Sequence, residues 1–158
     1  MKYLKLLLSL VLLVSIISCD TAEEKDKTLQ NNIWKFDELV GFENAEFNCD
    51  TYYKFNNSDG LMMNICGNSV EWTEFTFVKS ATSFTVKKTG GCDESGIGIE
   101  VVIDYRINGE KLIIEDPDFE IVFKFIKSLP DLTEIPDIEF GYFDEDDIWQ
   151  QSTCSYPY

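Results

Sequence analysis

Apolar and polar side chains alternate with a period of two along the middle of the chain. In residues 47–55, and again in residues 97–107, every second position is mostly apolar or aromatic and the positions between are mostly polar. This spacing is typical of a β-strand with one buried face. Further apolar segments predict about eight strands and no helix; they occupy residues 33–40, 61–66, 70–79, 83–88, 111–115 and 120–126.

Short turn sequences separate these segments and predict how the strands pair. Asn56–Gly60 is rich in turn-forming residues, and Asp116–Asp118 contains a proline. Asn108-Gly109 is the strongest short-range hairpin signal in the chain, and we expect positive φ at both of its positions. Strands joined by such short turns pair antiparallel with their neighbours in the sequence.

The strand pattern therefore predicts an all-β fold, a small antiparallel up-and-down barrel of about eight strands. Closure removes exposed strand edges and leaves an interior just wide enough for side chains or for one small ligand. A sandwich of two sheets is the alternative. Within residues 70–79 the apolar face changes between Trp72 and Phe75, which predicts a β-bulge.

Residues 1–18 differ from the rest and have the features of a secretory signal peptide. Lys2 and Lys5 precede an apolar run that is too short to span a bilayer comfortably, since about 20 apolar residues are needed. The ending Ile16–Cys19 resembles the lipobox of bacterial lipoproteins, in which the cysteine is lipidated, for example with palmitate, and becomes the first residue of the mature protein. This resemblance implies a lipid anchor at Cys19; an ordinary cleaved signal is the alternative.

The resemblance also implies a place in the cell envelope, with the outer membrane favoured. Residues 19–31 are polar and charged, as expected of a flexible acidic tether. A short acidic stretch after the lipidated cysteine resembles a surface-display signal of some Gram-negative groups, whereas Asp20 resembles an inner-membrane retention signal. The periplasmic face and the cell surface therefore both stay open.

Residues 128–158 form a distinct acidic segment after the predicted barrel. Pro130 and Pro136 interrupt regular structure, but the segment is too apolar for a free tail. We expect it to pack along the barrel, with one extra edge strand at residues 137–143.

The four cysteines that remain after Cys19 predict two disulfides, because the exported compartment is oxidising. With a turn centred near Ser58-Asp59, Cys49 falls nearly opposite Cys66, so we predict that these two form a cross-strand bond. Cys92 and Cys154 then pair by elimination. A zinc site is disfavoured because the chain has no histidine and no CxxC spacing.

The charge of the chain limits its partners. The net charge is −16, and removal of residues 1–18, which hold two lysines and no acids, leaves −18. Such a surface repels nucleic acid and anionic lipid head groups, so membrane contact is expected through the lipid alone. A basic protein would be attracted.

A family resemblance adds to these inferences. A tryptophan strand at residues 33–36 precedes a Cys-Asp…Phe…Asp-Gly hairpin that runs from Cys49 to Cys66, and a late hairpin at residues 105–114 has the pattern Tyr-x-Ile-x-Gly-x-x-Leu. This combination resembles the lipocalin-like domain of many bacterial envelope lipoproteins, over about residues 32–127. Its motifs are structural and imply no catalytic residue.

A second resemblance is weaker. Cys66-Gly67-Asn68 and Thr89–Cys92 are similar to pieces of the META or HslJ-like domains, but the order there would be Gly-Cys-Asn. We therefore prefer the lipocalin-like domain.

Known catalytic and cofactor motifs are not found in the sequence. The lack of histidine excludes Ser-His-Asp and Cys-His nucleophile systems, and the glycine-rich segments lack the Lys-Ser/Thr ending of a phosphate loop. Asp144–Asp147 lacks the spacing and the glycine of an EF-hand calcium loop. We therefore expect no enzymatic activity, no cofactor and no metal site.

The first functional hypothesis is a lipid-anchored barrel that binds a small apolar or amphipathic ligand. Strand aromatics are mainly core, but an open mouth would let some of them line a pocket. The alternatives are a module that captures a basic protein and a purely structural envelope lipoprotein. The candidate ligand-binding residues are Trp34, Phe36, Tyr53, Trp72 and Tyr105.

Overall fold

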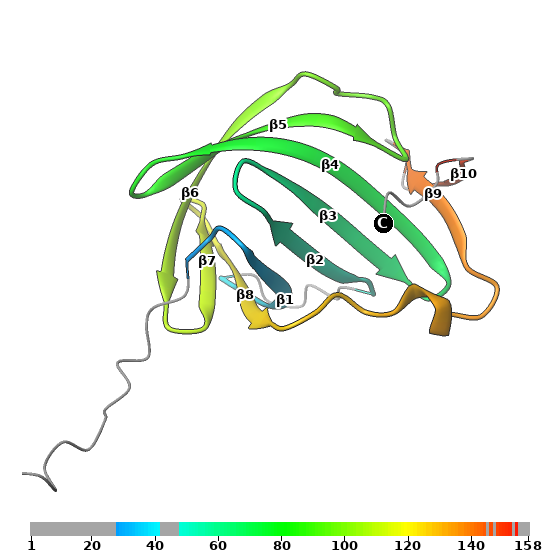
Figure 1. Ribbon diagram of the computed structural model, residues 1–158, viewed down its shortest axis with the longest axis horizontal. Helices are drawn as coiled ribbons and strands as arrows, with labels where there is room; N and C mark the ends of the chain where they lie inside the picture. Colours follow the sequence, from blue (N-terminus) through cyan, green and yellow to red (C-terminus); the bar gives the residue numbers. More distant parts are fainter. Residues whose placement is uncertain (1–27, 42–47, 145, 147, 153, 155–158) are drawn as a thin grey trace, which may run out of the picture.

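The computed structural model describes residues 28–41, 48–144, 146, 148–152 and 154. Within these residues no helix is long and apolar enough to cross a membrane. Eight strands follow one another along the chain (Figure 1). They are β1 (Asn32–Val40), β2 (Asp50–Phe55), β3 (Asp59–Cys66), β4 (Ser69–Lys79), β5 (Ser83–Gly91), β6 (Glu100–Asn108), β7 (Lys111–Glu115) and β8 (Glu120–Ile126).

These eight strands form a closed antiparallel barrel. Each strand pairs with its neighbours in the sequence, and β8 pairs back with β1, where Trp34 lies opposite Phe125. The closed ring confirms the predicted up-and-down barrel and excludes the two-sheet sandwich.

The connections between strands alternate between the two ends of the barrel, because neighbouring strands run in opposite directions. We call the end that holds residues 28–31 and the turn at residues 56–58 the N-terminal end, and Gln30 Nε2 donates a hydrogen bond there to the backbone oxygen of Asn57 (2.7 Å). The opposite end, which we call the mouth, carries the turn at residues 67–68 and the loop at residues 92–99.

The interior at the N-terminal end is filled with aromatic side chains. Phe55 is 1% exposed and contacts the rings of Phe75, Phe77 and Phe84 at centroid distances of 5.5, 5.2 and 5.6 Å. Leu29 is also 1% exposed and packs into the same core. Leu29, which the sequence pattern assigned to the tether, is therefore part of the barrel core.

The hairpin between β6 and β7 differs from the prediction in one detail. Asn108 pairs with Lys111 as the last rung of the ladder, so the two turn residues are Gly109 and Glu110. Gly109 has φ of 58°, and neither Asn108 nor Glu110 has positive φ. This is the pattern of a type II′ turn, in which only the first central residue needs positive φ.

The expected bulge lies in the strand beside the predicted one. The register between β4 and β5 shifts at Glu74/Phe75, where Glu74 lies opposite Gly90 and Phe75 lies opposite Lys88. The extra residue is therefore Thr89 of β5, while β4 itself pairs with β3 without a break. The alternation along β4 is continuous, and both of its faces bury apolar residues.

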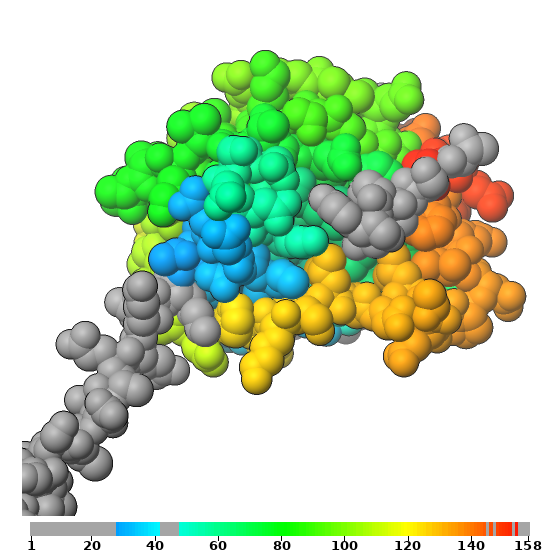
Figure 2. All heavy atoms as spheres, viewed as in Figure 1, coloured from blue at the N-terminus to red at the C-terminus, as the bar shows by residue number. Residues whose placement is uncertain are grey.

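The first outward-facing residues of β4, Val70 and Trp72, are apolar and lie under residues that follow β8. A 3-10 helix (η1, Leu132–Glu134) is followed by β9 (Glu139–Phe143), which pairs parallel to β4, and by β10 (Trp149–Gln151). Leu129 and Phe140 pack against a buried cluster of Leu61, Cys92 and the outward-facing Trp72. In the space-filling view this orange segment lies directly on the barrel wall (Figure 2), so the predicted extra strand at residues 137–143 is present and has a partner, β10.

Both predicted disulfides are present. The Cys49–Cys66 bond joins the ends of β2 and β3 at the mouth, with a Cα–Cα distance of 4.3 Å. The Cys92–Cys154 bond fastens the C-terminal segment to the start of the loop at residues 92–99, with a Cα–Cα distance of 5.1 Å. The C-terminal segment and the mouth loop are therefore covalently coupled.

Candidate ligand-binding site

An open cavity of about 340 Å³ lies inside the barrel toward the mouth. Its volume is at the lower end of the range of small-molecule sites, about 300–1,000 Å³. Its polar side chains are Thr73, Lys88, Asp93 and Ser95. Its apolar and aromatic side chains are Tyr53, Met62, Phe75, Val86, Ile99, Val101 and Ile103.

Strand alternation brings these side chains together. Tyr53, Met62 and Thr73 form one row across β2, β3 and β4, since Tyr53 lies opposite Met62 and Met62 opposite Thr73. Phe75 separates the cavity from the packed core. Its ring lies over Gly60, where an added Cβ would come within 2.4 Å of the ring. The glycine thus makes room for the aromatic floor of the cavity.

Tyr53 belongs to both the cavity wall and the aromatic core. Its ring stacks on Phe55 at 5.9 Å and meets Phe123 edge to face at 5.2 Å. Burial raises the pKa of the Tyr53 phenol, so its hydroxyl stays protonated at neutral pH. The hydroxyl is therefore a neutral hydrogen-bonding group at the edge of an apolar space.

An ion pair stands in the wall of the cavity near the mouth. Lys88 Nζ donates to Asp93 Oδ2 at 2.9 Å, and both side chains are partly buried. Burial would raise the pKa of Asp93, but hydrogen bonds from Ser95 and Lys88 outweigh it, so the pKa of Asp93 lies below its usual range. Asp93 also accepts from the Ser95 backbone N–H at 2.7 Å within the loop, while its bond to Lys88 joins the loop to β5.

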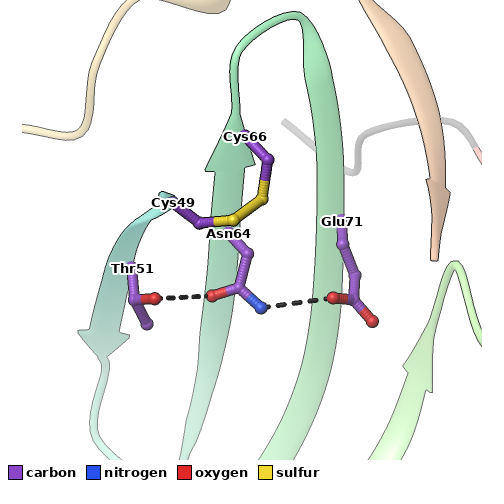
Figure 3. Close-up of a disulfide and its surroundings, with 5 residues drawn as sticks. All are labelled: Cys49, Thr51, Asn64, Cys66 and Glu71. Carbon is purple, nitrogen blue, oxygen red and sulfur yellow. Dashed lines mark hydrogen bonds between the residues drawn. A yellow bond between two sulfur atoms is a disulfide. The ribbon is translucent and has the colours of Figure 1, made fainter. Parts of the chain in front are cut away.

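Three hydrogen-bonded polar side chains lie closer to the mouth than the row of Tyr53, Met62 and Thr73. Thr51 Oγ1 donates to Asn64 Oδ1 at 2.8 Å, and Asn64 Nδ2 donates to Glu71 Oε2 at 3.2 Å. Figure 3 shows this row crossing β2, β3 and β4 beside the Cys49–Cys66 disulfide. All three positions share the inward face with the cavity residues Tyr53, Met62 and Thr73, because side chains two apart in a strand point the same way.

The Glu71 carboxyl is a charged group on the inner face of the barrel. Burial raises its pKa, the hydrogen bond from Asn64 and the charge of Lys88 lower it, and the charge of Asp93 raises it. Burial prevails, so the pKa of Glu71 lies above its ordinary value of 4.5. Among the described residues, no lysine or arginine forms an ion pair with this carboxyl.

The structure places the five predicted ligand-binding residues in three different environments. Tyr53 lines the cavity. Trp34 and Phe36 lie in the packed core, and Tyr105 packs on Phe84 near the N-terminal end. Trp72 points outward and is covered by the C-terminal segment, because even-numbered residues of β4 face away from the interior. Trp72 is therefore not in the barrel interior where the prediction placed it.

Most of the cavity wall was missed because the five predicted ligand-binding residues are all aromatic. Met62, Val86 and Ile103 are aliphatic, and nothing in the sequence separates them from core residues. Lys88 and Glu71 were missed because charged residues are usually expected on the outer face, and because Val70 and Trp72 on either side of Glu71 have the pattern of a buried face. The loop position of Ile99 was not expected either, because β6 begins at Glu100 and not at residue 97.

The structure describes the residues that could form a metal site in the barrel, but it does not describe Cys19. In the described part of the chain, no group of three or more cysteine, aspartate or glutamate side chains is placed to hold a metal ion. Cys19 lies outside the described residues, so its lipidation stays a prediction from the sequence.

Known proteins were compared with this chain in sequence and in structure. No family model and no curated protein matches the sequence. Among solved structures, the chain is similar to a lipocalin-like protein from Bacteroides uniformis, with a TM-score of 0.45 and 9% sequence identity. The similarity covers 59% of this chain and 94% of that chain. The assignment of the barrel rests on its own strand pairing.

Proposed function

We propose that this protein is a binding module that holds a small apolar or amphipathic ligand in the cavity of its barrel. The observation that carries the proposal is the division of the interior into two parts. Aromatic rings fill the N-terminal end, whereas a cavity of about 340 Å³ with mainly apolar walls stays open toward the mouth. Concave apolar sites with a few polar groups are the usual form of small-molecule sites.

The exposure of apolar side chains at the mouth supports the same proposal. Ile99 and Val101 line the cavity but are 61% and 50% exposed. A bound apolar group would cover part of this surface, and burial contributes roughly 25 cal/mol for each Å² of apolar surface removed from water.

We further propose that a lipid at Cys19 anchors the module to a membrane of the cell envelope. The support is the lipobox-like sequence at residues 16–19. Residues 28–31 enter the barrel at the N-terminal end, opposite the mouth. An anchor that precedes them would leave the cavity accessible to ligands from the surrounding medium.

A neutral fluorescent probe, N-phenyl-1-naphthylamine, tests the binding proposal. The full chain carrying Cys19→Ser should enhance the probe's fluorescence with saturation, and Val101→Trp should abolish the enhancement by filling the cavity. Val102→Trp is the matched control, because Val102 is the next residue of β6, points outward and is 66% exposed. Equal enhancement by both variants, or none by the parent, would contradict the proposal.

A further inference from the structure

The polar groups of the interior lie toward the mouth, where they line the cavity or follow it along the same strands. Thr73 lines the cavity, and Glu71 follows it two positions closer to the mouth on the same face of β4. At about 3.3 Å per residue, this separation along the strand is roughly 7 Å. A ligand with an apolar chain in the cavity would therefore place a terminal polar group beside Glu71.

The charges in this zone do not balance. Glu71 and Asp93 are acidic and Lys88 is basic, so the side chains nearest the cavity carry one surplus negative charge. Lys88 is already paired with Asp93 at 2.9 Å, and Asp93 is itself held by the backbone and hydroxyl of Ser95. An incoming anion would have to break this pair and would also meet the charge of Glu71.

Unlike Asp93, which is bound to a lysine, Glu71 accepts its hydrogen bond from a neutral amide. Asn64 donates to one carboxyl oxygen, and Thr51 fixes the Asn64 amide from the other side. The carboxyl is thus held in place on the inner face, and Lys88, the lysine whose charge reaches it, is bound to Asp93. Burying a carboxylate without a paired cation is unfavourable, and a cation that arrives with the ligand would relieve that cost.

We propose that the ligand of this cavity is a cationic amphiphile, a primary amine on an aliphatic chain, whose ammonium group pairs with Glu71 while the chain lies among Met62, Phe75 and Val86. This inference rests on the proposed function and specifies the ligand class of the same site. The chain-wide charge of −16 favours the approach of a cation over that of an anion.

Three ligands with the same chain and different head groups test the inference. Octylamine, octan-1-ol and octanoate are titrated by calorimetry into the full chain carrying Cys19→Ser, at pH 7 and low salt. Octylamine should bind about tenfold more tightly than octan-1-ol, as expected for a hydrogen bond to a charged group in a partly buried site. Octanoate should bind most weakly.

Substitutions on the two faces of the same strand supply the control. Glu71→Gln keeps the acceptor for Asn64 and should reduce octylamine affinity about tenfold while leaving octan-1-ol unchanged. Glu74 lies on the outer face of β4, so Glu74→Gln should change neither the affinity for octylamine nor the affinity for octan-1-ol. Lys88→Met should not weaken octylamine, whereas loss of octanoate binding in that variant would identify Lys88 as the head-group site.

The outcomes separate this inference from the proposed function. Selective loss of octylamine in Glu71→Gln supports both. Equal binding of all three ligands, or preference for octanoate, overturns the cationic ligand class but leaves an apolar binding module. No binding by any of the three ligands, together with no response of N-phenyl-1-naphthylamine, overturns both. Circular dichroism of each variant establishes that the barrel is folded before binding is compared.

Discussion

Replacing Phe55 by alanine tests whether the N-terminal half of the barrel is packed as described. Phe55 is 1% exposed, and four aromatic rings surround it, those of Tyr53, Phe75, Phe77 and Phe84. Truncation of a buried phenylalanine costs about 3–5 kcal/mol, because transfer free energy is lost and a cavity remains. Edge-to-face ring pairs add about 0.5–1.5 kcal/mol each, so we expect a loss near the upper limit, about 4–5 kcal/mol.

Urea unfolding followed by tryptophan fluorescence measures this loss. For a domain of this size, each kcal/mol lowers the melting temperature by roughly 3–5 °C, so the variant should melt about 12–25 °C lower. The control is Phe143→Ala, because Phe143 is 38% exposed and has one ring neighbour among the pairs described, Trp149, at 5.1 Å. The control should lose less than about 1 kcal/mol, as surface substitutions usually do.

A small effect of Phe55→Ala would contradict the packing argument. If both variants lost the same free energy of unfolding, the rings around Phe55 would not form a rigid core. The variant also has a consequence for binding. Phe55 lies behind Tyr53 and Phe75, so its removal should extend the cavity inward, and ligands with a longer chain should then gain affinity relative to octylamine.

Three further changes test other parts of the structure. Glu71→Gln should stabilise the protein at pH 7. Burial raises the pKa of Glu71 in the folded state above 4.5, so the native protein binds more protons than the unfolded chain between the unfolded and the folded pKa. The free-energy cost of ionising this buried carboxyl therefore builds up as the pH rises through that range, and the substitution removes it. Urea midpoints should show this gain at pH 7 and its disappearance below pH 4.5; a gain that is constant with pH would disprove the ionisation argument. Replacing Cys92 and Cys154 by alanine should cost about 4 kcal/mol, because the bond spans 62 residues, and limited proteolysis should then cut first in the C-terminal segment; cleavage within the barrel instead would argue against its role in holding that segment. Gly60→Ala should cost about 1–3 kcal/mol by overpacking against the Phe75 ring and the backbone oxygen of residue 54, and an unchanged melting temperature would count against the close contact.

The strand pattern predicted the barrel well because its information is local. Alternation in residues 47–55 and the turn signals around it specify which faces are buried and which strands are neighbours. The same register places Cys49 opposite Cys66, so this disulfide could be inferred without knowledge of the rest of the fold. The hairpin at Asn108-Gly109 was also predicted, but its turn type was not, since one rung of register decides which residues make the turn.

The candidate site was poorly predicted because it depends on distant contacts. Trp72 and Tyr53 look alike in the sequence, since each is an aromatic residue on a strand. Trp72 faces outward and is buried because residues after β8 cover it, which the local pattern cannot reveal. The apparent change of face between Trp72 and Phe75 has the same cause, because the outer face of β4 is covered at Val70 and Trp72 while the inner face is buried at Phe75.

The sequence by itself determined the strands, their antiparallel order and the four cysteines of the two disulfides. These features follow from side-chain alternation and short turns, which act between residues close together in the chain. Only the tertiary structure decided which end of the barrel is filled and which is open. That choice depends on Leu29 entering one end, on the loop at residues 92–99 standing at the other, and on the inward direction of Glu71 and Lys88. The packing of the barrel interior and the charge of the cavity wall depend on side chains from many strands together, so no single segment of the sequence reveals them.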